Sequence, residues 1–119
     1  MSLRTERVAS LIKEEVGMFL TREYRDSSYG FITVTDVQVT PDLRIAKIYV
    51  SILGNNEVRE RTMKMLKDNK GEIRSFIGSH VRIKFTPTVQ FHIDETMDRV
   101  EKIEKLIKQI HKDDNIPNN

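Results

Sequence analysis

The sequence predicts a single α+β domain in which helices cover one face of a three-stranded mixed sheet. Three observations lead to this fold class. Helical and strand periodicities follow one another in the order helix, strand, strand, helix, helix, strand, helix. The first two strands are joined by a short connection, so they should pair antiparallel. The third strand follows a helical crossover, which should bring it parallel to one of its partners.

The first predicted element is an amphipathic helix over residues 5–23. Its apolar side chains recur at three- and four-residue intervals, which places them on one helix face. They are Val8, Leu11, Ile12, Val16, Phe19 and Leu20. Thr5 is the expected N-cap, and Glu6 would follow in the first turn, where the helix dipole favours an acidic side chain. Turn-forming residues at 26–30 then end the helix.

Two strands follow and should form a hairpin. Residues 31–39 are rich in β-branched side chains, and Thr40-Pro41-Asp42 stops this strand. In the second strand apolar side chains occupy alternate positions, which predicts one face toward the core and one largely in water. The residues toward the core are Ala46, Ile48, Val50 and Ile52.

The next helical stretch is interrupted. An asparagine N-cap in the turn 54–56 should start a helix over 57–68. Its apolar face consists of Val58, Met65 and Leu66. Asn69 and Gly71 tolerate left-handed backbone angles, so the helix should end or kink at Asn69-Lys70-Gly71. Ile73, Phe76 and Ile77 then restart a helical pattern.

Strand alternation returns between residues 81 and 93. The expected inward side chains are Val81, Ile83, Phe85, Val89, Phe91 and Ile93. Pro87 cannot donate to a strand ladder and therefore predicts a bulge or an edge. A last helix, capped by Thr96, would bury Val100, Ile103, Ile107 and Ile110. Together these elements predict one domain over residues 1–112, followed by a frayed tail at 113–119.

Composition excludes several classes of protein. The 119 residues contain no cysteine, which excludes disulfides, thiol nucleophiles and zinc–thiolate sites. No apolar run is long enough to span a membrane, and the N-terminus does not read as a signal peptide. His80, His92 and His111 lack metal-ligand spacing, and the sequence has neither a P-loop nor a Gly-x-Ser-x-Gly motif. We expect a cytoplasmic, monomeric protein that is not an enzyme and uses no cofactor, metal, membrane or small-molecule substrate.

The positive charge is concentrated in one part of the chain. Residues 61–93 carry 7 basic and 2 acidic side chains, a net charge of +5, whereas the formal charge of the whole chain is +2. A one-sided basic patch is typical of a protein that binds phosphates. The candidate RNA-binding residues are Arg61, Lys64, Lys67, Lys70, Arg74, Arg82 and Lys84. We expect the break between the helices to bring five of these side chains together, namely Lys67, Lys70, Arg74, Arg82 and Lys84.

These candidates also have plainer interpretations. Basic side chains on a helix often do no more than keep it solvated, and Arg74 could pack its stem under the break. Tyr49 is as consistent with half-buried packing as with base stacking. Two other functions stay open: a protein-interaction module whose basic flank binds an acidic partner, and a hydrolase that acts on RNA.

Five ordered blocks of sequence carry a resemblance to a known family. Asn69-Lys70-Gly71 is similar to the Ala-x-Gly kink of the ribosome-binding factor A family, and the order of elements resembles a type II K-homology domain. The other blocks are Gly30-Phe-Ile-Thr-Val-Thr-Asp-Val37, Pro41-Asp42-Leu43, Ala46-Lys-Ile-Tyr-Val-Ser51 and residues 73–83. The resemblance covers roughly residues 4–110.

The resemblance implies a ribosome assembly factor that binds the immature small ribosomal subunit and its ribosomal RNA. It also implies support of late maturation and RNA processing, especially in the cold. The chain departs from the family at Asn69, where alanine is usual, and in Ser27-Ser28-Tyr29 before Gly30. Glu72 stands where an apolar residue is usual, and its carboxylate would repel a phosphate at this helix N-terminus.

Overall fold

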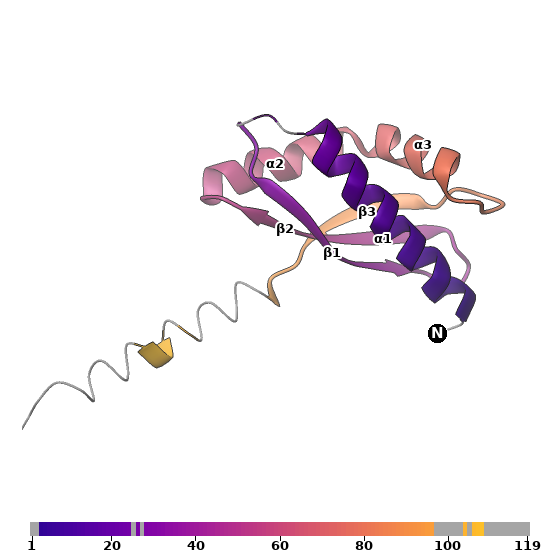
Figure 1. The fold of residues 1–119 in the computed structure, drawn as a ribbon, viewed down its shortest axis with the longest axis horizontal. Coiled ribbons are helices and arrows are strands. Elements are labelled where there is room, and N and C mark those ends of the chain that lie inside the picture. Colours follow the sequence, from indigo (N-terminus) through magenta and orange to yellow (C-terminus); the bar gives the residue numbers. More distant parts are fainter. Residues whose placement is uncertain (1–2, 25, 27, 97–103, 105, 109–119) are drawn as a thin grey trace, which may run out of the picture.

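The computed structural model describes residues 3–24, 26, 28–96, 104 and 106–108. Its elements are α1 (Leu3–Glu23), β1 (Phe31–Val39), β2 (Ile45–Leu53), α2 (Asn56–Asp68), α3 (Lys70–His80) and β3 (Thr88–Ile93). In Figure 1, α1 crosses in front of the strands, and α2 and α3 lie above them. The predicted α+β class and the order helix, strand, strand, helix, helix, strand are confirmed.

The sheet has the order β1-β2-β3 and is mixed, as predicted. β1 and β2 pair antiparallel, from Phe31 with Leu53 to Val39 with Ala46. The register shifts between Val34 and Asp36, so Thr35 forms a β-bulge that the sequence pattern did not predict. β2 and β3 pair parallel, from Ile45 with Thr88 to Val50 with Ile93.

The core lies between the helices and one face of the sheet. The sheet contributes Ile32, Val37, Val39, Ala46, Ile48, Val50, Ile52, Val89 and Phe91. The helices contribute Ile12, Val16, Leu20, Leu66, Ile73 and Ile77, all of them almost completely buried. The apolar residues that alternate in the strands and those that recur at helical spacing in α1 are therefore buried in the same core. This is why these elements could be predicted from the sequence.

A buried threonine joins α2 to the α1–β1 connection. Thr62 is 0% exposed, and its hydroxyl accepts a hydrogen bond from the Gly30 N–H over 3.0 Å. The same hydroxyl donates to the Val58 carbonyl over 2.7 Å. The hydroxyl thus both donates and accepts a hydrogen bond, so it is buried without an unpaired donor.

The N-cap prediction for the first helix was wrong. α1 already begins at Leu3, and Thr5 lies buried within its first turn. By contrast, α2 begins as predicted, because the Asn55 side chain accepts a hydrogen bond from the Val58 N–H over 2.9 Å.

The third strand is shorter than its sequence pattern predicted. β3 begins at Thr88, so Arg82 and Lys84 lie in a connection and not on a strand face. Phe85, predicted to point inward, is 75% exposed, whereas Pro87 is buried. The reason is the register: Thr88 pairs with Ile45, the first residue of β2, so residues before Thr88 have no strand to pair with.

The break between α2 and α3 is a single residue. α2 ends at Asp68 and α3 begins at Lys70, so both Lys70 and Gly71 are helical. Asn69 has φ −105° and ψ 17°, and Gly71 has no positive φ. The prediction of left-handed angles here was wrong, because i→i−4 hydrogen bonds continue on both sides of Asn69. Its N–H donates to the Met65 carbonyl over 3.1 Å, and its carbonyl accepts from the Ile73 N–H over 3.1 Å.

After β3 the structure differs from the predicted cap and burial. Asp94 Oδ1 accepts a hydrogen bond from the Thr96 N–H over 2.9 Å, and Thr96, predicted as the cap before the last helix, is itself in helical conformation. Ile107 is exposed, contrary to prediction. Val100, Ile103, Ile110 and the predicted tail at 113–119 lie outside the described residues. No helix in the described part of the chain combines the length and apolar character required to span a bilayer.

Candidate nucleic-acid interface

The parallel pairing of β2 and β3 brings together two connections that are distant in sequence. Both strands begin at the same edge of the sheet, because Ile45 pairs with Thr88. The Thr88 N–H also donates to the Arg44 carbonyl over 2.7 Å. The β1–β2 turn, residues 40–44, therefore lies beside the α3–β3 connection, residues 81–87. Both are at the right-hand end of the molecule in Figure 1.

The α3–β3 connection is fastened to α3 at Thr86. Arg74 Nη2 donates to the Thr86 carbonyl over 3.0 Å. A Cβ atom at Gly78 would lie 2.8 Å from Thr86 Oγ1, so the lack of a side chain there permits the close approach. These contacts fix the position of Thr86, and with it the end of the segment that carries Lys84 and Phe85.

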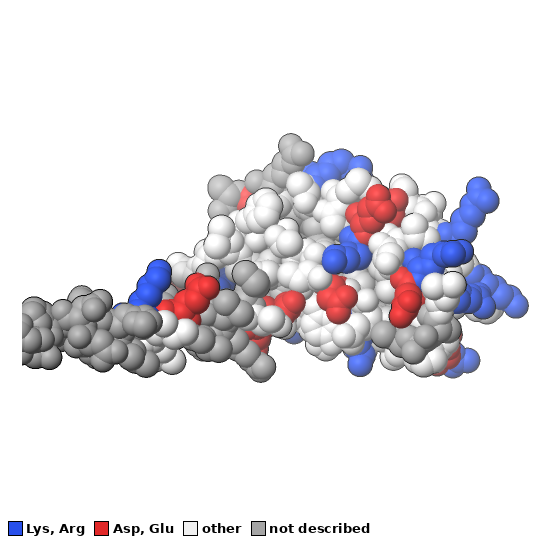
Figure 2. All heavy atoms as spheres, turned by 60° about the horizontal axis from the view of Figure 1, so that its bottom comes forward, with Lys and Arg blue, Asp and Glu red and all other residues white. Residues whose placement is uncertain are grey.

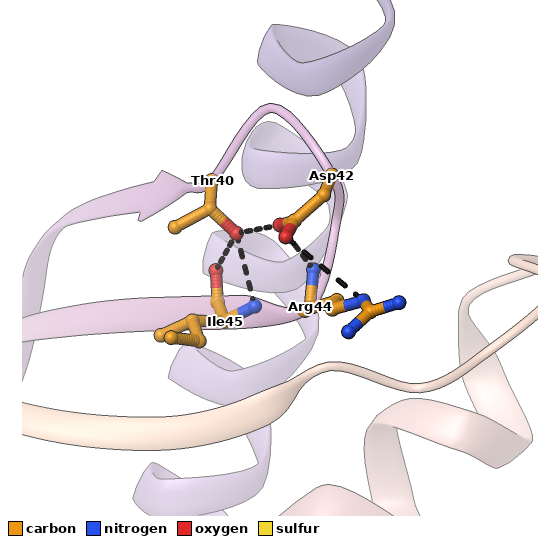
Figure 3. Close-up of polar contacts among 4 residues, drawn as sticks. All are labelled: Thr40, Asp42, Arg44 and Ile45. Carbon is orange, nitrogen blue, oxygen red and sulfur yellow. Dashed lines mark hydrogen bonds and ion pairs between the residues drawn. The ribbon is translucent and has the colours of Figure 1, made fainter.

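The β1–β2 turn is organised by side-chain hydrogen bonds (Figure 3). The Thr40 hydroxyl donates to Asp42 Oδ1 over 2.6 Å, and the Arg44 N–H donates to the same oxygen over 3.1 Å. The Ile45 N–H donates to the Thr40 hydroxyl over 3.1 Å. Leu43 has φ 60°, the left-handed conformation that often follows a tight turn in a hairpin. The position of Arg44 is therefore determined by a dense local network.

Asp42 is held in its charged form by this network. The Thr40 hydroxyl, followed by the Arg44 N–H, lowers the pKa of the Asp42 carboxyl. Its Oδ2 lies 3.9 Å from Arg44 Nε, which makes a long and exposed ion pair. An exposed pair of this kind contributes little to stability.

A groove of about 700 Å³ opens between these two connections. We call it the basic groove. Its charged residues come from four parts of the fold: Arg4 from α1, Asp42 and Arg44 from the β1–β2 turn, Arg74 from α3, and Lys84 from the α3–β3 connection. Its other lining residues are Pro41, Leu43, Ile83, Phe85, Thr86 and Thr88. Four basic and one acidic side chain give the groove a net charge of +3. Figure 2 shows Lys and Arg side chains gathered at the right-hand end of the molecule.

Two of the seven sequence candidates, Arg74 and Lys84, line the basic groove together. Lys70 precedes Arg74 by four residues in α3, so these two side chains share one helix face. Lys64 and Lys67 are exposed on α2, three residues apart, and Arg82 is exposed in the α3–β3 connection.

Arg61 lies away from the groove. Its Nη1 donates to the Ser28 carbonyl over 2.7 Å, in the α1–β1 connection at the opposite end of the molecule (Figure 1). This contact gives Arg61 a role in holding α2 against that connection. The seven candidates therefore do not form one cluster.

Sequence reasoning missed Arg4, Arg44 and Phe85 as residues of the groove. Residues 1–60 carry 8 basic and 9 acidic side chains, so a charge count by segment concealed the two arginines. The predicted topology could have identified Arg44. If β2 and β3 are parallel, the residues just before each strand must meet at one edge of the sheet.

His80 and His92 have structural contacts. The His92 ring stacks on Tyr49 with 5.4 Å between ring centroids, so Tyr49 packs against its strand neighbour on the open face of the sheet. His80 stacks on Phe76 at 4.0 Å in α3. Within the described part of the chain, no three His, Asp or Glu side chains are close enough together to hold a metal ion.

The comparison with protein families agrees with this arrangement. The model of the family described as ribosome-binding factor A matches residues 4–107. The chain belongs to the ribosome-binding factor A family. The match includes all six described elements except the first residue of α1, and every basic residue of the groove.

Solved structures of the ribosome-binding factor A family have the same fold. The crystal structure of ribosome-binding factor A from Thermus thermophilus is 16% identical, with a TM-score of 0.66 over 75% of this chain and 94% of that one. A Thermotoga maritima protein, named as a candidate ribosome binding factor A, is 29% identical. Its TM-score is 0.55 over 76% of this chain and 82% of that one.

A third similar structure is a homology model of the Thermus thermophilus factor, fitted into a cryo-EM map of a 30S complex. It is 17% identical, with a TM-score of 0.60 over 80% of this chain and 96% of that one.

Glu72, which we expected to repel a phosphate at this helix N-terminus, is directed away from the helix face that carries Lys70 and Arg74. It lies two residues from both Lys70 and Arg74, a spacing that places it on another side of α3. Burial, followed by the negative charge of Glu72, raises the pKa of the Tyr24 hydroxyl. The carboxylate is therefore near Tyr24, which follows α1.

Proposed function

We propose that this chain is an assembly factor that binds the small ribosomal subunit and contacts its ribosomal RNA. The observation that carries the proposal is the basic groove, in which four cations from distant parts of the sequence meet at one end of the sheet. Cations gathered on one surface are what a phosphate backbone requires. Membership of the ribosome-binding factor A family and the 30S complex of the Thermus factor support the same partner.

We further propose that the protein acts by binding, without catalysis or a cofactor, as a monomer in the cytoplasm. The binding would support late maturation and ribosomal RNA processing, especially in the cold, as the family resemblance implies. A deletion strain should then grow poorly at low temperature and accumulate precursor RNA of the small subunit. Expression of the wild-type chain should restore both growth and processing.

Sedimentation of cell lysate tests the partner. We expect the protein to migrate with free small subunits, and an exclusively ribosome-free pool would contradict the proposal. A matched pair of charge reversals locates the surface. Arg44→Glu with Lys84→Glu should abolish co-migration, whereas Lys64→Glu with Lys67→Glu on α2 should reduce it much less. A complex that survives complete RNA digestion would instead favour an acidic protein partner.

A further inference from the structure

Phe85 is the most unusual residue of the basic groove. It lies in the α3–β3 connection, where its side chain is 75% exposed among charged residues. Single exposed apolar side chains are common on protein surfaces and need no special explanation. Phe85 differs from such a case because of its neighbours. Lys84 Nζ lies 5.5 Å from the centre of its ring, and three arginines line the same groove.

The connection cannot turn Phe85 inward without losing other contacts. Two residues later Pro87 is buried, and Thr88 is tied to Arg44 by its N–H. Between them and Phe85, the Thr86 carbonyl accepts a hydrogen bond from Arg74. The backbone on the C-terminal side of Phe85 is thus attached both to α3 and to the β1–β2 turn. The ring is held at the surface by a fastened backbone.

An exposed aromatic ring beside several cations matches the chemistry of unpaired nucleic acid. Proteins that bind single strands combine a positive groove along the backbone with aromatic side chains on which bases stack. A base inside a duplex cannot stack in this way, because its faces are covered by its neighbours. The groove volume of about 700 Å³ is within the range of small-ligand pockets, roughly 300–1,000 Å³.

We propose that the basic groove binds an unpaired segment of RNA, with one base stacked on Phe85 and the adjacent phosphates bound by Arg44, Arg74 and Lys84. This inference rests on the proposed function and assigns it a site and a class of RNA. The site is at the end of the sheet that carries the β1–β2 turn. It is therefore distinct from the α2–α3 break, where the backbone stays helical through Lys70 and Gly71.

The absence of tryptophan in the sequence allows a direct test. Phe85→Trp places a single fluorescent indole in the groove, where a stacked base should quench it. Leu53→Trp is the matched control, because Leu53 is equally exposed at 75% but lies at the far end of β2. Titration with a short unstructured oligouridylate or oligoadenylate should quench Phe85→Trp and leave Leu53→Trp unchanged. A duplex RNA of equal length should quench neither.

Affinity measurements separate stacking from charge. Phe85→Ala should weaken binding of the single-stranded oligonucleotide by roughly 5- to 150-fold, the usual range for loss of one base stack. Its salt dependence should stay unchanged, since no charge is removed. Lys84→Ala should lower the salt slope by about 0.7. Because Phe85 and Lys84 are both exposed, both variants should keep the wild-type unfolding temperature.

The outcomes distinguish this inference from the proposed function. If the wild-type chain migrates with small subunits but Phe85→Ala binds the oligonucleotide as tightly as wild type, the stacking site is wrong and the partner is right. If quenching is equal in Phe85→Trp and Leu53→Trp, the stacking site is also wrong. A wild-type chain that binds oligonucleotides but never small subunits would contradict the proposed partner alone.

Discussion

Thr35 Oγ1 donates a 2.6 Å hydrogen bond to Asp94 Oδ2, although the two residues lie on or beside strands that are not neighbours. Thr35 is the bulged residue of β1, and Asp94 directly follows β3. The bulge takes Thr35 out of the regular pairing with β2. The contact thus ties the two edge strands together across the central one.

Removal of this hydroxyl should weaken the domain. Thr35→Val keeps the shape and the β-branch but loses the hydrogen bond to a carboxylate, so we expect a loss of about 1 kcal/mol in the free energy of unfolding. Denaturant unfolding measures it, with an unchanged m-value. Thr33→Val on the exposed face of β1 is the control and should change stability by less than about 0.5 kcal/mol. Equal losses from both would show that the contact to Asp94 is unimportant.

The same contact predicts how stability depends on pH. Hydrogen bonds from Thr35 and then from Thr96 lower the pKa of Asp94, and the pKa of Asp42 is lowered by Thr40 and Arg44. The unfolded chain therefore binds more protons than the folded chain between the two pKa values. The stabilisation that these two carboxylates give the folded state is complete above their usual pKa, near pH 4. It is lost as the pH falls through their lowered pKa values in the folded protein. Unfolding midpoints at several pH values should show this decline, and Thr35→Val should make it shallower.

Binding to single-stranded RNA should depend on salt to the extent set by the groove. If three or four phosphates are neutralised, affinity should fall roughly 20- to 50-fold between 50 and 200 mM monovalent salt. Fluorescence anisotropy with a labelled oligonucleotide measures the slope. A slope near zero would mean that the basic groove does not bind phosphates.

The helical conformation of Gly71 reverses the effect that a left-handed glycine would have. No atom of the described residues lies within 4 Å of a Cβ built at Gly71, so an added methyl group meets no obstacle. Gly71→Ala should therefore stabilise the protein by about 0.5 kcal/mol. Asn69→Ala should cost a similar amount, because Asn69 Nδ2 donates to the Met65 carbonyl over 2.7 Å. Thermal unfolding of both variants checks the two signs, and a destabilised Gly71→Ala would contradict the helical assignment.

Thr62 should be the most sensitive polar position of the core. Thr62→Val leaves the Gly30 N–H without its buried partner, which should cost roughly 1–3 kcal/mol. Thr62→Ser keeps the hydroxyl and should lose less. If the valine variant were as stable as wild type, the hydrogen bond from Gly30 would not support the α1–β1 connection.

The sequence predicted elements best where one periodicity ran through the whole element. In β2, alternate residues from Ala46 to Ile52 are buried, and β1 has the bounds expected from its β-branched residues. The same periodicity failed between Val81 and Phe85. There the alternation continued in the sequence, but β2 offers no residue before Ile45 to pair with. Register between distant strands is a tertiary property, and local alternation does not contain it.

The candidate site was predicted in part for a similar reason. Arg74 and Lys84 lie in the basic stretch of the chain and were identified from local charge. Arg4 and Arg44 lie in a stretch of nearly balanced charge. The parallel crossover places Arg44 beside the connection that carries Lys84, and Arg4 reaches the groove from α1. A count of charges by sequence segment cannot find a cluster whose members come from distant segments and meet only in the folded protein.

The parallel pairing of β2 with β3 also determines when the groove comes into existence during synthesis. A nascent chain that has released only its first strands and helices already carries Arg4, Arg44 and Arg74. It lacks the Thr88–Arg44 hydrogen bond that closes the edge on which they meet. Pairing over this sequence separation is slow relative to local helix formation, because the loop must close first. Affinity for RNA should therefore arise only in a chain that has completed its fold, and bound RNA should in turn raise the unfolding temperature of that chain.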